Sequence, residues 1–119
     1  MDDYTITIEE IASWFSSKVP TLEVAGVILA GIQERRGTSK PSAFADYDTD
    51  LGIGRIVVWV SGEIDFEVLR RSDGEGVLFR HEQVSTLSEP SLESAFNTFL
   101  ASMVHPHSQI SKRDATQNE

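Results

Sequence analysis

Acidic side chains at alternate positions are the groups in this sequence with the clearest chemical capacity. Glu63, Asp65 and Glu67 alternate with apolar residues over 63–69. Paired carboxylates can act as general acid and base in a cleft that perturbs their pKa values, or they can bind the cationic groups of a partner. A period of two instead places them on the wet face of a strand, which offers no cleft. We therefore predict that they bind a partner and catalyse no reaction.

The histidines and glycines do not form a catalytic constellation. His81 is predicted to lie on a buried strand face, whereas His105 and His107 fall in a C-terminal tail. None has a nucleophile at a matched spacing, and two histidines in a tail are too few ligands for a metal site. Residues 52–54 lack the lysine and the helix start of a phosphate-binding loop, so we interpret them as a turn. The sequence predicts no catalytic residue, no metal and no cofactor.

Three aspartates in the middle of the chain have the alternation of a calcium-binding loop. Such a loop also requires a glycine at its sixth position and a glutamate at its twelfth. Counted from Asp46, those positions hold Leu51 and Val57. Calcium is therefore not favoured, and we count Asp46 and Asp48 among the carboxylates available to a partner.

Acidity is the strongest global property of the chain. Its 119 residues carry a net charge of −9, and residues 42–93, with eleven acidic and four basic side chains, hold −7 of it. Polyanions are bound through lysine and arginine, so direct binding of nucleic acid is disfavoured. An acidic surface attracts cationic partners and speeds their association, although solubility alone also explains such a charge.

Length and composition indicate one domain in the cytoplasm. We predict a single domain over residues 1–104 and a disordered tail over 105–119, which lacks periodicity. The chain has no cysteine, as is typical of small domains in a reducing compartment. The acidic N-terminus has neither a basic n-region nor an apolar h-region, and no stretch approaches the roughly 18 apolar residues of a membrane span, so we expect neither secretion nor a membrane span.

The first third of the chain is predicted to be helical. Thr7 and Glu10 have the spacing of a capping box, which starts a helix, and Pro20 ends or kinks it. Residues 22–33 fit either a second helix or a buried strand. The basic turn before Gly37 resembles a helix C-terminus, which favours the helix.

The hydrophobic period then falls to two, which predicts a sheet. Strands are predicted at residues 55–60, 63–70 and 76–84, with 42–48 as a candidate first strand. An amphipathic stripe over 92–103 predicts a closing helix. The predicted class is α+β, an antiparallel meander of three to four strands packed on one face by the N-terminal helix or helices and a C-terminal helix.

The last hairpin determines which side chains meet. Asp73-Gly74 is a preferred pair for a two-residue type I′ turn. This turn would pair Glu67 with Arg80 and Asp65 with Glu82 on the wet face, and Val68 with Phe79 and Phe66 with His81 on the buried face. Opposed carboxylates repel unless they share a cation, such as a partner's lysine or arginine. The alternative is a sheet face charged only for solubility and to discourage edge pairing.

The position of Trp59 depends on the connection at Ser61-Gly62. A two-residue turn buries Trp59 against Ile64, whereas a three-residue loop puts it on the acidic face, where it could anchor a partner. Burial is the commoner outcome, and we predict it. The candidate binding residues, with Trp59 included for the second case, are Glu63, Asp65, Glu67, Glu82, Asp46, Asp48 and Trp59.

The hairpin also carries a family resemblance. Residues 59–69 have the pattern Trp-x-Ser-Gly-Glu-x-Asp-x-Glu-Val-Leu, and they are followed by Leu-Phe-Arg-His-Glu at 78–82 and by the closing helix. This half of the chain, over 54–103, resembles the TriTu-type immunity proteins of bacterial contact-dependent growth inhibition and polymorphic toxin systems.

The resemblance implies a cytoplasmic antidote that binds the C-terminal nuclease domain of its cognate toxin. The toxin would typically be an RNase that acts on tRNA, and some members form a ternary complex with elongation factor Tu. An acidic antidote complements the basic surface that a nuclease presents to its substrate. The alternative is an acidic adaptor or secretion-chaperone-like module, which would bind through its apolar helix surface.

Overall fold

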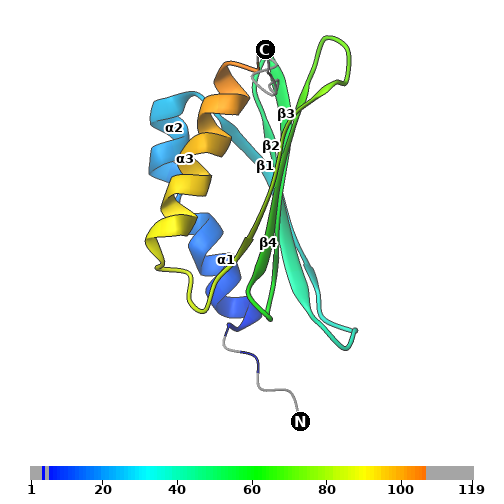
Figure 1. The fold of residues 1–119 in the computed structure, drawn as a ribbon, viewed down its shortest axis with the longest axis vertical. Coiled ribbons are helices and arrows are strands. Elements are labelled where there is room, and N and C mark those ends of the chain that lie inside the picture. Colours follow the sequence, from blue (N-terminus) through cyan, green and yellow to red (C-terminus); the bar gives the residue numbers. More distant parts are fainter. Residues whose placement is uncertain (1–3, 5, 107–119) are drawn as a thin grey trace, which may run out of the picture.

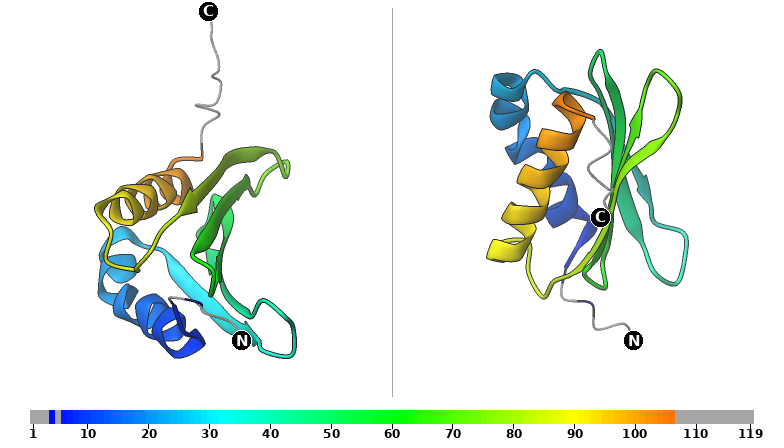
Figure 2. Two further views of the ribbon diagram at one scale, coloured as in Figure 1. Left: turned by 60° about the horizontal axis from the view of Figure 1, so that its bottom comes forward. Right: turned by 45° about the horizontal axis from the view of Figure 1, so that its top comes forward.

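A five-stranded antiparallel sheet with three helices on one face makes up the protein, as seen in its computed structural model (Figures 1 and 2). The structure describes residue 4 and residues 6–106. Along the chain the elements are α1 (Ile8–Ser17), α2 (Val19–Ala25), β1 (Ile28–Arg35), β2 (Ser42–Asp48), β3 (Gly52–Trp59), β4 (Glu63–Arg70), β5 (Gly76–Gln83) and α3 (Pro90–Val104). Neighbouring strands in the sequence are neighbours in the sheet. The α+β class and the meander are confirmed, with five strands in place of three to four.

The predicted N-terminal helix begins where the capping box places it. The Thr7 side chain accepts a hydrogen bond from the backbone N–H of Glu10 at 3.1 Å, and the Glu10 carboxylate accepts one from the backbone N–H of Thr7 at 2.8 Å. These two bonds satisfy groups that the helix itself leaves without partners. The helix then buries Ile8, Ile11, Trp14 and Phe15 against the sheet.

The helix predicted for residues 22–33 is wrong beyond residue 25. Pro20 lies in the first turn of α2, where a missing N–H costs nothing, so it helps to start this helix and does not simply end the first. Gly26, with φ of 80°, ends α2, and the chain continues into β1. Residues 34–36 had been predicted as the last turn of this helix, and they instead include the end of β1.

The closing helix α3 packs its apolar stripe against the inner face of the sheet. Phe99 is fully buried; its ring centroid lies 5.1 Å from that of Tyr47 and 6.0 Å from that of Phe66. Burial of a side chain of this size contributes about 1.5–3 kcal/mol. This packing fixes which face of the sheet is covered. The predicted tail begins after α3, and its residues 107–119 lie outside the described part.

The β4–β5 connection is a four-residue loop, not the predicted two-residue turn. Arg70 N–H donates to the carbonyl of Glu75 at 2.7 Å, and the Asp73 carboxylate accepts from the Arg70 side chain and from the backbone N–H of Glu75. The hydrogen bond from Arg70 holds the pKa of Asp73 below its usual value. The register also shifts between Val68 and Leu69, because β5 carries an extra residue, Val77.

The longer loop by itself moves the register by two residues and keeps the faces, whereas the bulge at Val77 moves it by one and exchanges the two faces of β5. Asp65 is opposite His81, and Glu67 is opposite Phe79. The predicted pairs Glu67–Arg80, Asp65–Glu82, Val68–Phe79 and Phe66–His81 are therefore wrong. Phe79 and His81 lie on the outer face, where burial had been predicted for both.

The β3–β4 connection places Trp59 on the outer face. Its loop comprises residues 60–62, and Gly62 N–H donates to the Trp59 carbonyl at 2.9 Å. Gly62 has φ of 94°, and a Cβ there would lie 2.1 Å from the carbonyl oxygen of Val84, so this tight approach needs glycine. The predicted burial of Trp59 is wrong, and the outer-face alternative is correct. Trp59 is half-buried there.

Among the described residues, none of the helices has both the length and the apolar character needed to cross a bilayer.

Replacing Gly54 with alanine tests the packing of α3. Gly54 lies near the start of β3, as do Gly52 and Ile53, so the turn predicted for residues 52–54 is wrong. A Cβ on Gly54 would lie 2.6 Å from Met103 Sδ and 2.7 Å from Phe99 Cζ. Because α3 must shift to make room, we expect Gly54→Ala to lower the free energy of unfolding by about 1–3 kcal/mol in urea titrations. Gly31→Ala is the matched control in β1, since no atom lies within 4 Å of the added Cβ. Equal stabilities of the two variants would contradict this packing.

Tyr47 predicts a loss of stability at alkaline pH. Its hydroxyl is buried without a hydrogen-bond partner among the described residues, and this burial, with the nearby charge of Asp46, raises the pKa of the phenol. The unfolded chain therefore loses this proton above a pH of about 10 while the folded chain retains it, so stability falls as the pH rises. We expect Tyr47→Phe to reduce that alkaline loss and to cost no stability at neutral pH.

Urea titrations at neutral pH and above pH 10 measure this effect. Tyr4→Phe is the control, because the Tyr4 hydroxyl is exposed and donates to the Ser39 carbonyl. An alkaline loss of the same size in Tyr47→Phe and in the wild type would contradict the assignment.

Candidate functional site

The outer face of the sheet is left uncovered by the helices, which all lie on the other side (Figures 1 and 2). We call this surface the open face. Alternation along four strands assigns its members. They are Ser42, Phe44, Asp46 and Asp48 of β2; Ile53, Arg55, Val57 and Trp59 of β3; Glu63, Asp65, Glu67 and Leu69 of β4; and Phe79, His81 and Gln83 of β5.

Most of the predicted binding residues share the open face. Those that it brings together are Asp46, Asp48, Trp59, Glu63, Asp65 and Glu67. Glu82 is the exception, because the shifted register turns it to the helix side. There its carboxylate accepts from Arg80 Nε at 2.8 Å, and Arg80 also donates to Thr98 of α3. The predicted repulsion between Asp65 and Glu82 does not occur.

An arginine–aromatic stack crosses the open face at β2. The guanidinium groups of Arg35 and Arg55 lie 5.2 Å and 4.2 Å from the ring centroid of Phe44, which they cover. Arg55 also donates two hydrogen bonds to the Asp46 carboxylate, at 2.7 Å and 3.1 Å. These bonds raise the pKa of Arg55 above its usual value, so its guanidinium stays charged.

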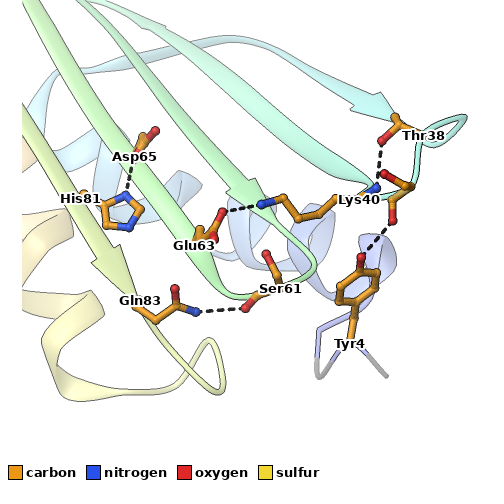
Figure 3. Close-up of polar contacts among 9 residues, drawn as sticks. Tyr4, Thr38, Lys40, Ser61, Glu63, Asp65, His81 and Gln83 are labelled. Atoms are coloured by element: carbon orange, nitrogen blue, oxygen red, sulfur yellow. Dashed lines mark hydrogen bonds and ion pairs between the residues drawn. The ribbon is translucent and has the colours of Figure 1, made fainter. Parts of the chain in front are cut away.

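A second cation neutralises the corner of the open face near the β3–β4 loop. Lys40 Nζ donates to the Glu63 carboxylate at 2.7 Å (Figure 3). The same Nζ lies 5.7 Å from the ring centroid of Trp59. The lysine thus links the two predicted binding residues to each other. An exposed pair of this kind contributes only roughly 0–1 kcal/mol to stability.

Two further carboxylates of the open face have partners, and one does not. His81 Nδ1 lies 2.6 Å from the Asp65 carboxylate (Figure 3), and Arg71 donates to Asp48 at 2.6 Å. The exposed Glu67 carboxylate makes no hydrogen bond or ion pair with any described residue. Glu67 is therefore the carboxylate of the open face that a partner's cation can reach without displacing an internal one.

Phe79 is an exposed aromatic residue that sequence reasoning missed. It lies on the edge strand β5 with 72% of its surface exposed, and Ile53, at 40%, is also exposed on the open face. Leu69 is the cross-strand partner of Ile53. The signal that could have revealed Phe79 was the extra residue in β5, Val77, because this bulge reverses the facing of the rest of β5. Large exposed apolar side chains grouped on one face are typical of interaction sites.

The chemistry available on the open face is that of protein binding. Its carboxylates, Glu67 excepted, approach guanidinium, ammonium or imidazole groups, and Asp46 and Glu67 line one shallow hollow that is open to water. Within the described part of the chain, no group of three or more histidine, aspartate or glutamate side chains is arranged to hold a metal ion. The face combines charge with exposed apolar area, as the rim and core of an interface do.

A separate apolar surface lies at the junction of α2 and β1, where Val24 belongs to the helix and Ile28 is the cross-strand partner of Asp48. Val24 is 91% exposed and Ile28 is 64% exposed. A pocket beside them is lined by Val19, Leu22, Glu23, Val27, Ile28 and Leu29. This surface is the one that an adaptor-type function would use.

Comparison with known proteins supplies one match. The family model described as "Immunity protein TriTu" matches residues 9–102, a span that runs from α1 into α3 and includes the whole open face. Comparison with curated proteins finds no match.

Proposed function

Because this chain belongs to the TriTu family of immunity proteins, we propose that it neutralises a cognate toxin by binding the toxin's C-terminal nuclease domain through the open face. The observation that carries the choice of surface is an uncovered sheet face that combines several carboxylates with an exposed aromatic residue, Phe79, which is opposite Glu67. A nuclease presents lysine and arginine to its anionic substrate. The open face has the complementary charge and blocks substrate access when it is bound there.

The net charge supports rapid capture of such a toxin. The chain carries −9, and a negative field of this kind attracts a basic partner and raises the association rate above that of neutral proteins. Speed matters to an antidote, because a nuclease turns over many substrates before it is bound. Neutralisation by occupancy requires one immunity chain per toxin and no catalytic residue.

The finer proposal concerns the toxin and the compartment. We take the toxin to belong to a contact-dependent growth inhibition system and to cleave tRNA, which places the encounter in the cytoplasm. Elongation factor Tu, which binds aminoacylated tRNA, is the third protein that we would add to the purified pair. The resemblance of residues 59–69 to the TriTu type is what supports these details.

A second candidate function rests on the exposed apolar surface at Val24 and Ile28. An acidic adaptor or secretion-chaperone-like module would bind its partner there, through α2 and the adjoining start of β1. Its affinity would depend on apolar area and change little with salt. The two functions therefore differ both in the surface used and in the salt dependence.

Titration of the toxin with the immunity protein tests the proposed function. The toxin domain is the C-terminal domain encoded immediately upstream of this chain, and the readout is cleavage of bulk tRNA. We expect cleavage to stop at one immunity chain per toxin domain. We also expect Val24→Ser to leave the inhibition unchanged, because it alters only the helix side. A neighbouring gene that encodes no such toxin, or RNA cleavage that persists at excess immunity protein, would contradict the proposal.

The salt dependence of association is a further prediction. If opposite charges steer the encounter, the association rate constant should fall by about one to two orders of magnitude as NaCl rises from about 20 mM to about 500 mM. Stopped-flow fluorescence on the toxin domain measures this rate. A rate constant that stays level over this range would favour the adaptor function and its apolar contacts.

A further inference from the structure

We propose that binding on the open face is centred on one place, the pocket beside Glu67 and Phe79, which receives a single lysine or arginine side chain of the toxin. This inference rests on the proposed function and narrows it. Sequence reasoning treated the carboxylates as equivalent members of one acidic patch. Their contacts in the structure make them unequal.

The internal ion pairs remove most carboxylates from competition for a partner. Asp46, Glu63 and Asp65 each have a nitrogen of Arg55, Lys40 or His81 within 2.7 Å of a carboxylate oxygen. A toxin cation that approaches Asp46 or Glu63 exchanges one ion pair for another, and one that approaches Asp65 displaces the contact with His81, so each gains less than it would at a free carboxylate. Glu67 has no such partner among the described residues, so a cation there adds a new charge-assisted bond.

The position of Arg55 explains why Glu67 is unpaired. Arg55 is directly opposite Glu67 across the β3–β4 pair. Its guanidinium instead turns toward β2, where Asp46 accepts both of its hydrogen bonds and the Phe44 ring holds it at 4.2 Å. One guanidinium thus lies beside two carboxylates but is bonded only to Asp46. This leaves a local excess of negative charge at Glu67 on β4.

The surface beside Glu67 is hollowed and partly apolar. The residues that line this pocket are Asp46, Ile53, Gly54, Arg55, Glu67 and Leu69. Ile53 and Leu69 are a cross-strand pair, so together they form an apolar wall. A lysine or arginine side chain fits such a place, because its methylene stem packs on apolar atoms while its charged end reaches the carboxylate.

Phe79 provides an aromatic contact on the β5 side of Glu67, whereas the pocket lies on the β3 side of this residue. It is directly opposite Glu67 in the β4–β5 pair, which places the two Cβ atoms about 4.5–5.5 Å apart. The ring is 72% exposed, so a partner that covers it buries apolar area now in contact with water. A cation held at Glu67 also lies within reach of the ring face, and this adds a cation–π attraction.

A matched pair of charge-neutralising variants tests the inference. Glu67→Gln and Glu63→Gln change the same residue type on the same strand and the same face, but only Glu63 has an internal partner, Lys40. We expect Glu67→Gln to raise the Kd for the upstream-encoded toxin domain at least about ten-fold and Glu63→Gln to change it less than about three-fold. We expect Phe79→Ala to weaken binding at least about ten-fold, with unchanged far-UV circular dichroism. Isothermal titration calorimetry measures all four proteins, including the wild type.

The possible results separate this inference from the proposed function. If the wild type binds and inhibits the toxin but the Glu67 and Phe79 variants bind within three-fold of it, the pocket is not the centre and the proposed function stands. If Glu63→Gln weakens binding as much as Glu67→Gln does, the acidic patch acts as a whole and the inference is wrong. If the wild type does not bind the toxin domain, both the inference and the proposed function are wrong.

Discussion

Contact between α3 and the inner face of the sheet is the constraint on which the rest of the structure depends. Phe99 lies against Tyr47 and Phe66, and it closes on the backbone at Gly54, where even a methyl group would collide. Once this face is covered, the period of two along each strand assigns every alternate residue to the open face. The surface offered to a partner is thus a consequence of how the other side packs.

The same constraint explains why the open face carries cations as well as acids. Five strands at a spacing of about 4.8 Å bring the carboxylates of adjacent strands close together, which is unfavourable if none is neutralised. Arg55 and Lys40 lie between them, each held on an aromatic ring, at Phe44 and Trp59 respectively. Aromatic support orders these long side chains, so the ion pairs keep a defined geometry even though they contribute little to stability.

Local patterns in the sequence predict the elements, and long-range contacts decide the faces. The capping box at Thr7 and the alternation over 63–69 are complete within a few residues, and both are confirmed. The two hairpin connections are not local in this sense. The β3–β4 loop depends on Gly62 meeting Val84, and the register of β5 depends on the bulge at Val77 against β4. One extra residue in a strand exchanges its faces, which is why Glu82 and Phe79 were assigned to the wrong sides.

Charge on the open face has two separable effects. Steering depends on the summed field of the whole chain, to which paired and unpaired carboxylates both contribute through the net charge. Affinity depends on the contacts formed after docking, and an ion pair that already exists cannot be formed again. The internal pairing of Asp46 and Glu63 therefore preserves attraction at long range while it limits contact with arbitrary cations at short range. Discrimination between basic partners then depends on the few positions where an unpaired charge lies beside exposed apolar side chains. An acidic surface can be selective in this way.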